Sequence, residues 1–356
     1  MLSAALPINW SRDASDHNQY IEETIVCAIN GIAGLQSLGM ANVFESLAAA
    51  NQHVLITLQA DNDFYSQVER TVLVLMRSAM AASTLPTELP SGDRVVLKTG
   101  MGSSAALVTS LVAAAVSFFV PTISIQDRRD DLQLVHNLAQ LSHCFIQRKV
   151  GSGFDVSAAC FGSQQYSRFP SSMLAAFSSA ALLEPTAIGR CITDYAAWDV
   201  AGRVKPFQLP RGFHLMMGDV MSGSATVSMV RKKSVPEEAS RHISALNNHN
   251  IAVERTLKDV GQLLDRDGSA AGNWERKLEL MAAETHSKMG RMAGVPIEPP
   301  EQTALLDATM RLPGVLVAGV PGAGGYDAIF VIAIHQNALL DVEKLWVAWP
   351  ETHPGS

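Results

Sequence analysis

The stretch 98–119, KTGMGSSAALVTSLVAAAVSFF, begins with closely spaced glycines and serines and then runs apolar for several helical turns. The residues at its start, RVVLKTG at 94–100, predict a short strand that stops at glycine. A helix is predicted from Ser103 to about Phe119, because Pro121 disfavours helix in the residue before it. This order of strand, loop and helix directs backbone N–H groups towards the positive end of a helix dipole, where a phosphate can bind.

The same stretch raises the question of a membrane span, since no residue from Thr99 to Gln126 is charged. Polar residues interrupt it, however, at Thr109, Ser110 and Ser117, and it lacks a basic flank and an aromatic belt. Its helical part is also at the short end for a span. The sequence therefore predicts a buried core helix and no membrane partner.

The glycine–serine loop admits three interpretations. It is not a Walker loop, because GxxxxGK[ST] occurs nowhere in the chain. Residues 100–105 fit GxGxxA, and Asp127 ends the next apolar segment, which is the order found in a Rossmann dinucleotide site. Lys98 at the end of the strand argues against that fold, and the paired Ser103 and Ser104 suit a triphosphate with a metal ion. On spacing alone, a nucleotide-phosphate loop, a Rossmann loop and a structural turn without a ligand all remain open.

Length and composition limit the class of protein. A chain of 356 residues is long for a single core and suggests two domains, with a boundary near residue 205. Hydrophobic residues make up 47% and charged residues 17%, which is typical of a well-packed globular protein. The formal net charge of −7 and the absence of a basic tract argue against a nucleic-acid partner.

Cysteine spacing and the N-terminus predict the compartment. The four cysteines, at 27, 144, 160 and 191, contain no CxxC pair, so free thiols in a reducing compartment are expected. The first residues have no basic start and no long apolar run, which argues against a signal peptide. A cytosolic protein is therefore expected.

The remaining sequence predicts alternating helices and strands. The segment 127–149 predicts a helix with an apolar stripe formed by Leu132, Val135, Leu138, Leu141 and Phe145. A glycine turn at 151 leads into mixed strand or helix up to 169. Further helices are predicted at 20–38, 224–264, 273–293 and 301–312, and strands at 53–64, 212–220 and on both sides of a glycine-rich loop within 314–334.

Several segments carry a resemblance to a known family. KTGMGSSAALVTS at 98–110, GSGFDVSAACFGSQQYSRF at 151–169 and GVPGAGGYDAIF at 319–330 resemble three signature segments of the fungal and plant phosphomevalonate kinases, in the GHMP kinase superfamily. VPIEPPEQTALLDATM at 295–310 and LITLQADNDFYS at 55–66 are similar to the same family. The resemblance runs in order from about residue 18 to 335.

The resemblance implies an α+β protein with two domains. Residues 1–204 would form a ribosomal-protein-S5-like β/α domain, truncated at its start, and residues 205–356 a ferredoxin-like domain, with the active site between them. It also implies ATP and Mg²⁺ as cofactors, 5-phosphomevalonate as a small-molecule substrate, and a monomer or homodimer. A peroxisomal location is an alternative to the cytosol. Another GHMP kinase acting on an alcohol such as mevalonate or homoserine, or a truncated nucleotide binder without turnover, remain alternatives for the function.

The resemblance carries over to individual residues. Lys98 and Asp155 match catalytic positions, and Ser104 is the expected metal ligand. The phosphate-binding set comprises Gly100, Met101, Gly102, Ser103, Ser104, Ala105 and Ala106 in the first loop with Gly322, Ala323, Gly324 and Gly325 in the third motif, and the substrate-binding set comprises Ser152, Gly153, Ser222 and Ser224.

Chemistry refines the two catalytic roles. Lys98 would offset the charge shared by the γ-phosphate and the substrate phosphate. Asp155 is expected to orient groups and balance charge rather than act as a general base, because a phosphate monoester is largely deprotonated at neutral pH.

The sequence departs from the superfamily pattern in two places. Where many GHMP kinases have a glutamate that binds Mg²⁺, His143 and Cys144 stand here, and neither is a hard oxygen donor. The superfamily's first motif has no counterpart near the N-terminus, so we expect the isolated chain to be unstable or weakly active. His136 and His143 lie two helical turns apart, too far to share one metal ion without other ligands, and are expected to be core or polar-face histidines. Arg148 and Lys149 at the end of their helix are candidates to receive the substrate phosphate, although cations at a helix C-terminus need no ligand to explain them.

Overall fold

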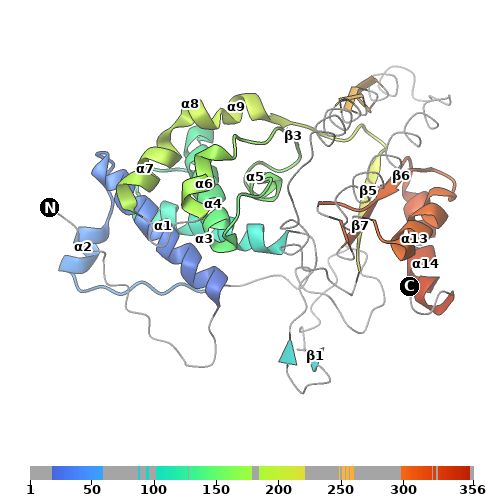
Figure 1. Cartoon of the computed structure of the whole chain (residues 1–356), viewed down its shortest axis with the longest axis horizontal. Coiled ribbons are helices and arrows are strands. Elements are labelled where there is room, and N and C mark those ends of the chain that lie inside the picture. Colours follow the sequence, from blue (N-terminus) through green and yellow to red (C-terminus); the bar gives the residue numbers. More distant parts are fainter. Residues whose placement is uncertain are drawn as a thin grey trace. The chain divides into compact units, whose positions relative to one another are not determined.

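The computed structural model describes two compact units of the chain (Figure 1). The first lies within Met1–Leu58 and Gly102–Gln208, and the second within Gln59–Met101 and Leu209–Ser356. The described residues are 18–58, 87–88, 94–95, 102–126, 128–178, 184–220, 298–322, 324–325 and 328–352, with short helical pieces between 248 and 259.

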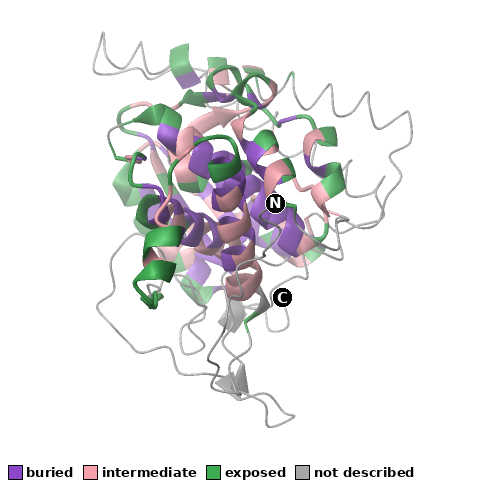
Figure 2. Cartoon of the chain, turned by 90° about the vertical axis from the view of Figure 1, so that its left-hand side faces the viewer, coloured by how far each residue is buried: buried purple, intermediate pink, exposed green. Residues whose placement is uncertain are grey.

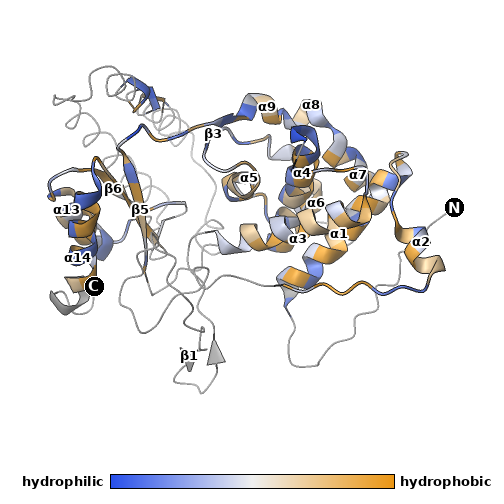
Figure 3. Cartoon of the chain, turned by 180° about the vertical axis from the view of Figure 1, so that it is seen from behind, coloured by the Kyte–Doolittle hydropathy of each residue, from blue (hydrophilic) through white to orange (hydrophobic). Residues whose placement is uncertain are grey.

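Helices dominate the described part of the first unit. They are α1 (Gln19–Ser37), α2 (Phe44–Ala49), α3 (Ser103–Phe119), α4 (Arg129–Gln147), α5 (Phe154–Phe161), α6 (Ser172–Ser178), α7 (Pro185–Thr193), α8 (Tyr195–Trp198) and α9 (Val200–Arg203). Strands β3 (Gln164–Tyr166) and β4 (Val204–Pro206) pair antiparallel, with Gln164 opposite Pro206. Helices α1 and α3 carry mostly hydrophobic residues (Figure 3).

Helix α4 forms the centre of this unit. It packs against α1, α3, α5, α6 and α7, and every residue from 134 to 146 is buried. Figure 2 shows buried residues, in purple, gathered among the helices. Its apolar stripe therefore meets the core as predicted, but its polar face is buried as well. Because buried polar groups need hydrogen-bond partners, this face has to be satisfied by neighbouring elements.

The second unit contains a three-stranded antiparallel sheet. Its strands are β5 (His214–Asp219), β6 (Val315–Gly319) and β7 (Ala328–Ala333), in the order β5-β7-β6. Helices α13 (Pro300–Met310) and α14 (Gln336–Thr352) pack against strands of this sheet. The Trp346 indole N–H of α14 donates to Thr309 Oγ1 of α13 at 2.9 Å. A short hairpin of β1 (Thr87–Glu88) and β2 (Arg94–Val95) is also described.

Most predicted elements are confirmed where the structure describes them. α1, α3, α4, α13 and the strands β5, β6 and β7 lie where the sequence predicted them. The strand predicted over 53–64 is wrong for its described part, because residues 53–58 pair with no strand of the described chain and Leu55 is 89% exposed. The helices predicted at 273–293 and over most of 224–264 lie outside the described residues, and α6 to α9 and α14 were not predicted. None of the described helices is long and apolar enough to cross a membrane.

Helices α1 and α7 approach each other closely at Gly34. A Cβ built on Gly34 would clash with the Pro185 carbonyl oxygen and lie 2.9 Å from the Gly189 amide nitrogen. Both atoms belong to the backbone and cannot rotate away. The missing side chain at Gly34 thus sets how near the two helices lie.

We expect Gly34→Ala to lower the free energy of unfolding by about 2 kcal/mol, because overpacking forces the backbone apart. The matched control is Gly31→Ala on the same helix, where the new methyl meets the movable Leu138 side chain at 2.6 Å. Chemical denaturation measures both variants. Equal losses of stability would contradict the close backbone approach as the cause.

Candidate active site

The N-terminus of α3 is open for an anion. Its N-cap is Gly102, which has a left-handed φ of 80°, and no described side chain caps the helix. The first helical bond runs from the Ala106 N–H to the Gly102 carbonyl at 3.1 Å. The N–H groups of Ser103, Ser104 and Ala105 have no acceptor within the helix, as in any first turn. Three backbone donors and the helix dipole are therefore available to a phosphate.

A second glycine, Gly153, lies at the start of helix α5. Gly153 is its N-cap, with a φ of 77°, and no described side chain caps this helix either. The Gln140 side-chain amide donates to the Gly153 carbonyl at 2.6 Å, and the Tyr166 hydroxyl donates to the Ser152 carbonyl at 2.8 Å. A Cβ at position 153 would meet Gln140 Oε1 and Phe169 Cε1, each at 2.6 Å. The turn before α5 is thus held by hydrogen bonds and by tight packing.

Asp155 lies beside the N-terminus of α3. Its Cβ is 4.0 Å from a Cβ built on Gly102, and its Oδ1 accepts from the Val156 N–H at 2.9 Å. The side chain is 26% exposed, so the carboxylate is accessible from solvent. Two helix starts and one carboxylate therefore meet at one place. The roles predicted for the phosphate loop and for Asp155 stay predictions.

His143 lies between these two helix starts. Its Nε2 is 3.3 Å from Ser104 Oγ and 2.7 Å from Gln147 Nε2, and its Nδ1 is 3.9 Å from Asp155 Oδ2. Burial lowers the pKa of His143 below its usual value, against the opposing effect of the Asp155 charge. The ring is therefore neutral at physiological pH.

Serine, histidine and aspartate in this order also occur in nucleophilic triads. The separations here are longer than the hydrogen bonds of about 2.6–3.2 Å that activate a nucleophile. Ser104 is also the second residue of an uncapped helix, where its backbone N–H faces the anion site. The arrangement fits charge placement around a phosphate better than attack by serine.

A buried hydrogen-bond network supports the turn that precedes α5. The Asn137 amide donates to the Ile192 carbonyl at 2.9 Å, and its Oδ1 accepts from His136 Nδ1 at 3.0 Å. His136 Nε2 lies 3.2 Å from the same Gln140 amide nitrogen that binds Gly153. Gln140 therefore donates one hydrogen to His136 and one to Gly153. This chain of contacts connects α7 to the turn that carries Asp155.

Burial lowers the pKa of His136 to about 4. Protonation would also place an N–H on Nε2 against the Gln140 donor. Between pH 6.5 and about pH 4 the unfolded chain binds a proton at this position and the folded chain does not, so stability falls as the pH drops through this window.

We expect the ionisation of His136 to contribute about 3 kcal/mol of acid destabilisation across that window. Denaturant titrations from pH 7 to pH 4 on the wild type and His136→Gln measure it. The variant should be less stable at pH 7 but lose less stability on acidification. Parallel pH profiles for the two proteins would contradict the assignment.

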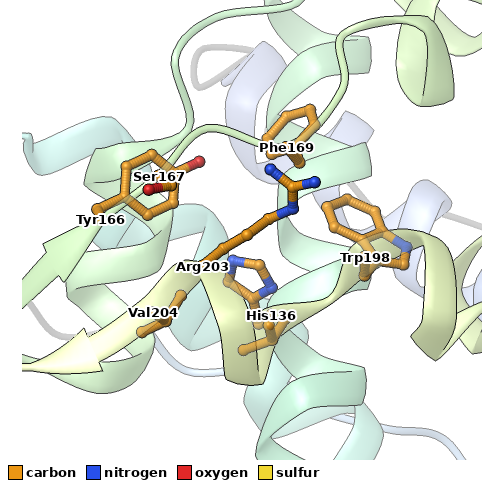
Figure 4. Close-up of a pocket in the computed structure, with 8 residues that line it drawn as sticks. His136, Tyr166, Ser167, Phe169, Trp198, Arg203 and Val204 are labelled. Atoms are coloured by element: carbon orange, nitrogen blue, oxygen red, sulfur yellow. The ribbon is translucent and has the colours of Figure 1, made fainter. Parts of the chain in front are cut away.

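A small cavity lies next to this network (Figure 4). Figure 4 shows Phe169, Trp198 and His136 around the Arg203 guanidinium, which donates to the Arg168 carbonyl at 2.8 Å. The cavity measures about 10 Å³. It is too small for a nucleotide or a phosphorylated substrate, so it belongs to the packing behind the site.

The Arg148 side chain is held by contacts within the first unit. Its guanidinium pairs with Glu23 at 3.0 Å, donates to the Phe145 carbonyl at 2.8 Å and lies 4.0 Å from the Phe145 ring centroid. It also ends α4 with a left-handed φ of 53°. These contacts account for the position of the cation at the end of the helix.

The third glycine motif forms the loop between β6 and β7. Gly322, Gly324 and Gly325 have left-handed φ values of 65°, 77° and 86°, and the Gly324 N–H donates to the Pro321 carbonyl at 3.2 Å. The loop belongs to the second unit. Six predicted site residues lie outside the described part of the chain, namely Lys98, Gly100, Met101, Ser222, Ser224 and Ala323.

The structure adds residues that the sequence did not single out for the site. Gln140 and Gln147 contact the α5 turn and His143, and His143 itself joins the two helix starts. One signal was available, since His136, Gln140, His143 and Gln147 recur at helical spacing and so share a face of α4.

No group of three or more His, Cys, Asp or Glu residues able to hold a metal ion occurs among the described residues. His136 belongs to the buried network, and His143 lies between the two helix starts. Ser104 and Asp155 are two oxygen donors beside the α3 start that suit a hard cation.

Comparison with known proteins identifies the family. The model of the GHMP kinases N terminal domain matches residues 68–163, and that of the GHMP kinases C terminal domain matches residues 263–351. The peroxisomal phosphomevalonate kinase of Arabidopsis thaliana is 34% identical, with 83% of this chain and 68% of that protein covered. The phosphomevalonate kinase of Aspergillus fumigatus is 38% identical, with 79% of this chain and 59% of that protein covered.

A solved structure agrees with the fold. The phosphomevalonate kinase of Streptococcus pneumoniae matches with a TM-score of 0.50 at 14% identity, covering 93% of this chain and 79% of that one. The matches to the two curated relatives span 59% to 68% of their length. The α+β architecture of the GHMP kinases expected from the sequence is therefore confirmed, and this chain belongs to the phosphomevalonate kinase family of the GHMP kinases.

Proposed function

We propose that this chain transfers the γ-phosphoryl group of ATP to the phosphate of 5-phosphomevalonate, giving ADP and 5-diphosphomevalonate. Curated relatives at 34% and 38% identity are named for this activity. The observation that carries the proposal is the position of Asp155, whose Cβ lies 4.0 Å from a Cβ built on Gly102 at the start of α3, where no described side chain caps the helix. A carboxylate there can orient groups around a phosphate that the backbone holds.

The donor nucleotide would bind through the first turn of α3. The N–H groups of Ser103, Ser104 and Ala105 would receive phosphate oxygens, helped by the helix dipole. Gly102 leaves room for close approach of the phosphates, since Asp155 is the only side chain of the described residues within 4 Å of its added Cβ. We also predict that Lys98 and the loop of Gly322, Gly324 and Gly325 contribute to binding the phosphates.

The acceptor phosphate needs little proton removal before phosphoryl transfer. It has a second pKa of about 6 and is mostly deprotonated at neutral pH. Asp155 therefore serves position and charge balance with Lys98 rather than proton removal. Ser152 and Gly153 precede Asp155, and the exposed Ser152 side chain is available to the acceptor, whereas Gly153 acts through the turn.

Magnesium fits the oxygen donors of the site. Ser104 would hold the ion together with the nucleotide phosphates, and the Asp155 carboxylate, which shares its neighbour His143 with Ser104, would add negative charge beside it. When bound, the ion would supply charge neutralisation to the transferring phosphoryl group. The cytosolic or peroxisomal location and the monomeric or homodimeric state remain predictions.

A coupled assay for ADP release tests the proposal. We expect turnover with 5-phosphomevalonate and none above background with mevalonate or homoserine. Turnover with an alcohol alone would make the chain a different GHMP kinase and restore a proton-removing role for Asp155. Stabilisation by MgATP in a thermal melt without turnover of any acceptor would favour the nucleotide binder.

A further inference from the structure

His143 is the described side chain that connects the two halves of the site. It comes from α4, is buried, and lies between Ser104 on α3 and Asp155 on α5. Its polar atoms are 3.3 Å from the serine oxygen and 3.9 Å from the nearer carboxylate oxygen. A leucine at this position would pack without the cost of desolvating a polar ring, so packing alone does not explain the histidine.

The neighbouring amide assigns the ring proton. Gln147 Nε2 lies 2.7 Å from His143 Nε2 and can only donate, so Nε2 is the acceptor. The proton of the neutral ring is then on Nδ1, the nitrogen that faces Asp155. At 3.9 Å this contact is a charge–dipole attraction rather than a hydrogen bond.

Ser104 is ordered by the same ring. The Nε2 lone pair already accepts from Gln147 at 2.7 Å, so the Ser104 hydroxyl at 3.3 Å is a second, weaker donor that shares it, and the serine oxygen lone pairs stay free for a ligand. One buried imidazole thus sets the rotamer of a hydroxyl on one helix start and attracts the carboxylate on the other.

We propose that His143 is a positioning residue that holds the Ser104 hydroxyl and the Asp155 carboxylate in register for phosphoryl transfer. Only the expected effect on turnover rests on the proposed function; the contacts of His143 do not depend on it. Small displacements of positioned groups lower turnover strongly while leaving much of the ground-state binding intact.

Three substitutions separate the two contacts. His143→Leu removes both, His143→Asn keeps a donor near the Nδ1 position, and His143→Gln keeps a polar group near the Nε2 position. We expect His143→Leu to lower kcat about 10-fold or more, as losses of supporting residues do, with a smaller change in the KM for ATP. The asparagine and glutamine variants should each recover part of the loss.

The control is Ser142→Ala on the same helix. Its hydroxyl is buried and donates to the Leu138 carbonyl at 2.8 Å, so its loss reports general damage to α4. We expect lower stability and an unchanged kcat. A kcat loss equal to that of His143→Leu would overturn the positioning role.

A double-mutant cycle tests whether His143 acts through Asp155. Adding His143→Leu to Asp155→Asn should lower kcat by less than His143→Leu alone does, because the partner is already altered. Fully multiplicative losses would overturn the inference.

A spectroscopic measurement makes the inference independent of turnover. Nitrogen NMR of the histidine rings should show the His143 proton on Nδ1, and both Ser104→Ala and Asp155→Asn should shift its signals. A proton on Nε2, or signals insensitive to both substitutions, would overturn the positioning role even if the kinase is active. Shifted signals in a chain without turnover would uphold the contacts and overturn only the proposed function.

Discussion

Asp155→Asn is expected to reduce turnover of 5-phosphomevalonate by about 100-fold or more, because it removes a charge that balances and orients the phosphates. Asparagine has the same shape and keeps an oxygen that can accept from the Val156 N–H at 2.9 Å. The side chain is also partly exposed, so its neutralisation leaves little unsatisfied in the core. We therefore expect the free energy of unfolding to change little while kcat falls.

Asp194→Asn provides the matched control. Asp194 also lies at a helix start in the first unit, where its carboxylate accepts from the Ala197 N–H at 3.1 Å. Asparagine is an equally good N-cap, so neither stability nor turnover should change much. Near-normal turnover of Asp155→Asn in the coupled ADP assay would remove Asp155 from the mechanism.

Gly153→Ala is expected to destabilise the protein by about 3 kcal/mol, combining backbone strain and overpacking. The new methyl would lie 2.6 Å from both Gln140 Oε1 and Phe169 Cε1, on a backbone with a φ of 77°. Moving Gln140 would also weaken its hydrogen bond to the Gly153 carbonyl. Because this turn starts α5, turnover should fall together with stability.

Gly102→Ala separates strain from overpacking. Its φ of 80° matches that of Gly153, and it too is the N-cap of a helix, but the nearest described atom is Asp155 Cβ at 4.0 Å. We expect a loss of only about 1 kcal/mol from backbone strain. Denaturant unfolding of the two variants should therefore differ clearly, and equal losses would show that packing around Gly153 is not the cause.

The core elements were predictable because their signals are local. Helix α3 begins after Gly102 and ends before Pro121, and both residues act on their immediate neighbours. The apolar stripe of α4 likewise predicts a helix with a buried face. The nucleotide interpretation of the 98–110 loop required the resemblance, since spacing alone left a Rossmann loop open.

The arrangement behind the site was not predictable in the same way. Polar residues on α4 suggest a solvent-facing side, yet Asn137, Gln140 and His143 are buried and paired with groups from distant segments. Their partners at Ile192, Gly153 and Ser104 are adjacent only in the folded chain. The strand predicted over 53–64 fails in its described part for a related reason, because a strand needs a partner and residues 53–58 pair with none among the described residues.

The most direct test of the central claim is the response of the α3 backbone amides to nucleotide. Backbone amide NMR of the wild type, titrated with a non-hydrolysable ATP analogue and Mg²⁺, follows Ser103, Ser104 and Ala105 individually. We predict saturable shifts of these three signals, while Ile188 in the buried part of α7 stays unchanged. Saturable binding that leaves all three α3 amides unmoved would contradict the claim that the first turn of α3 holds the phosphates.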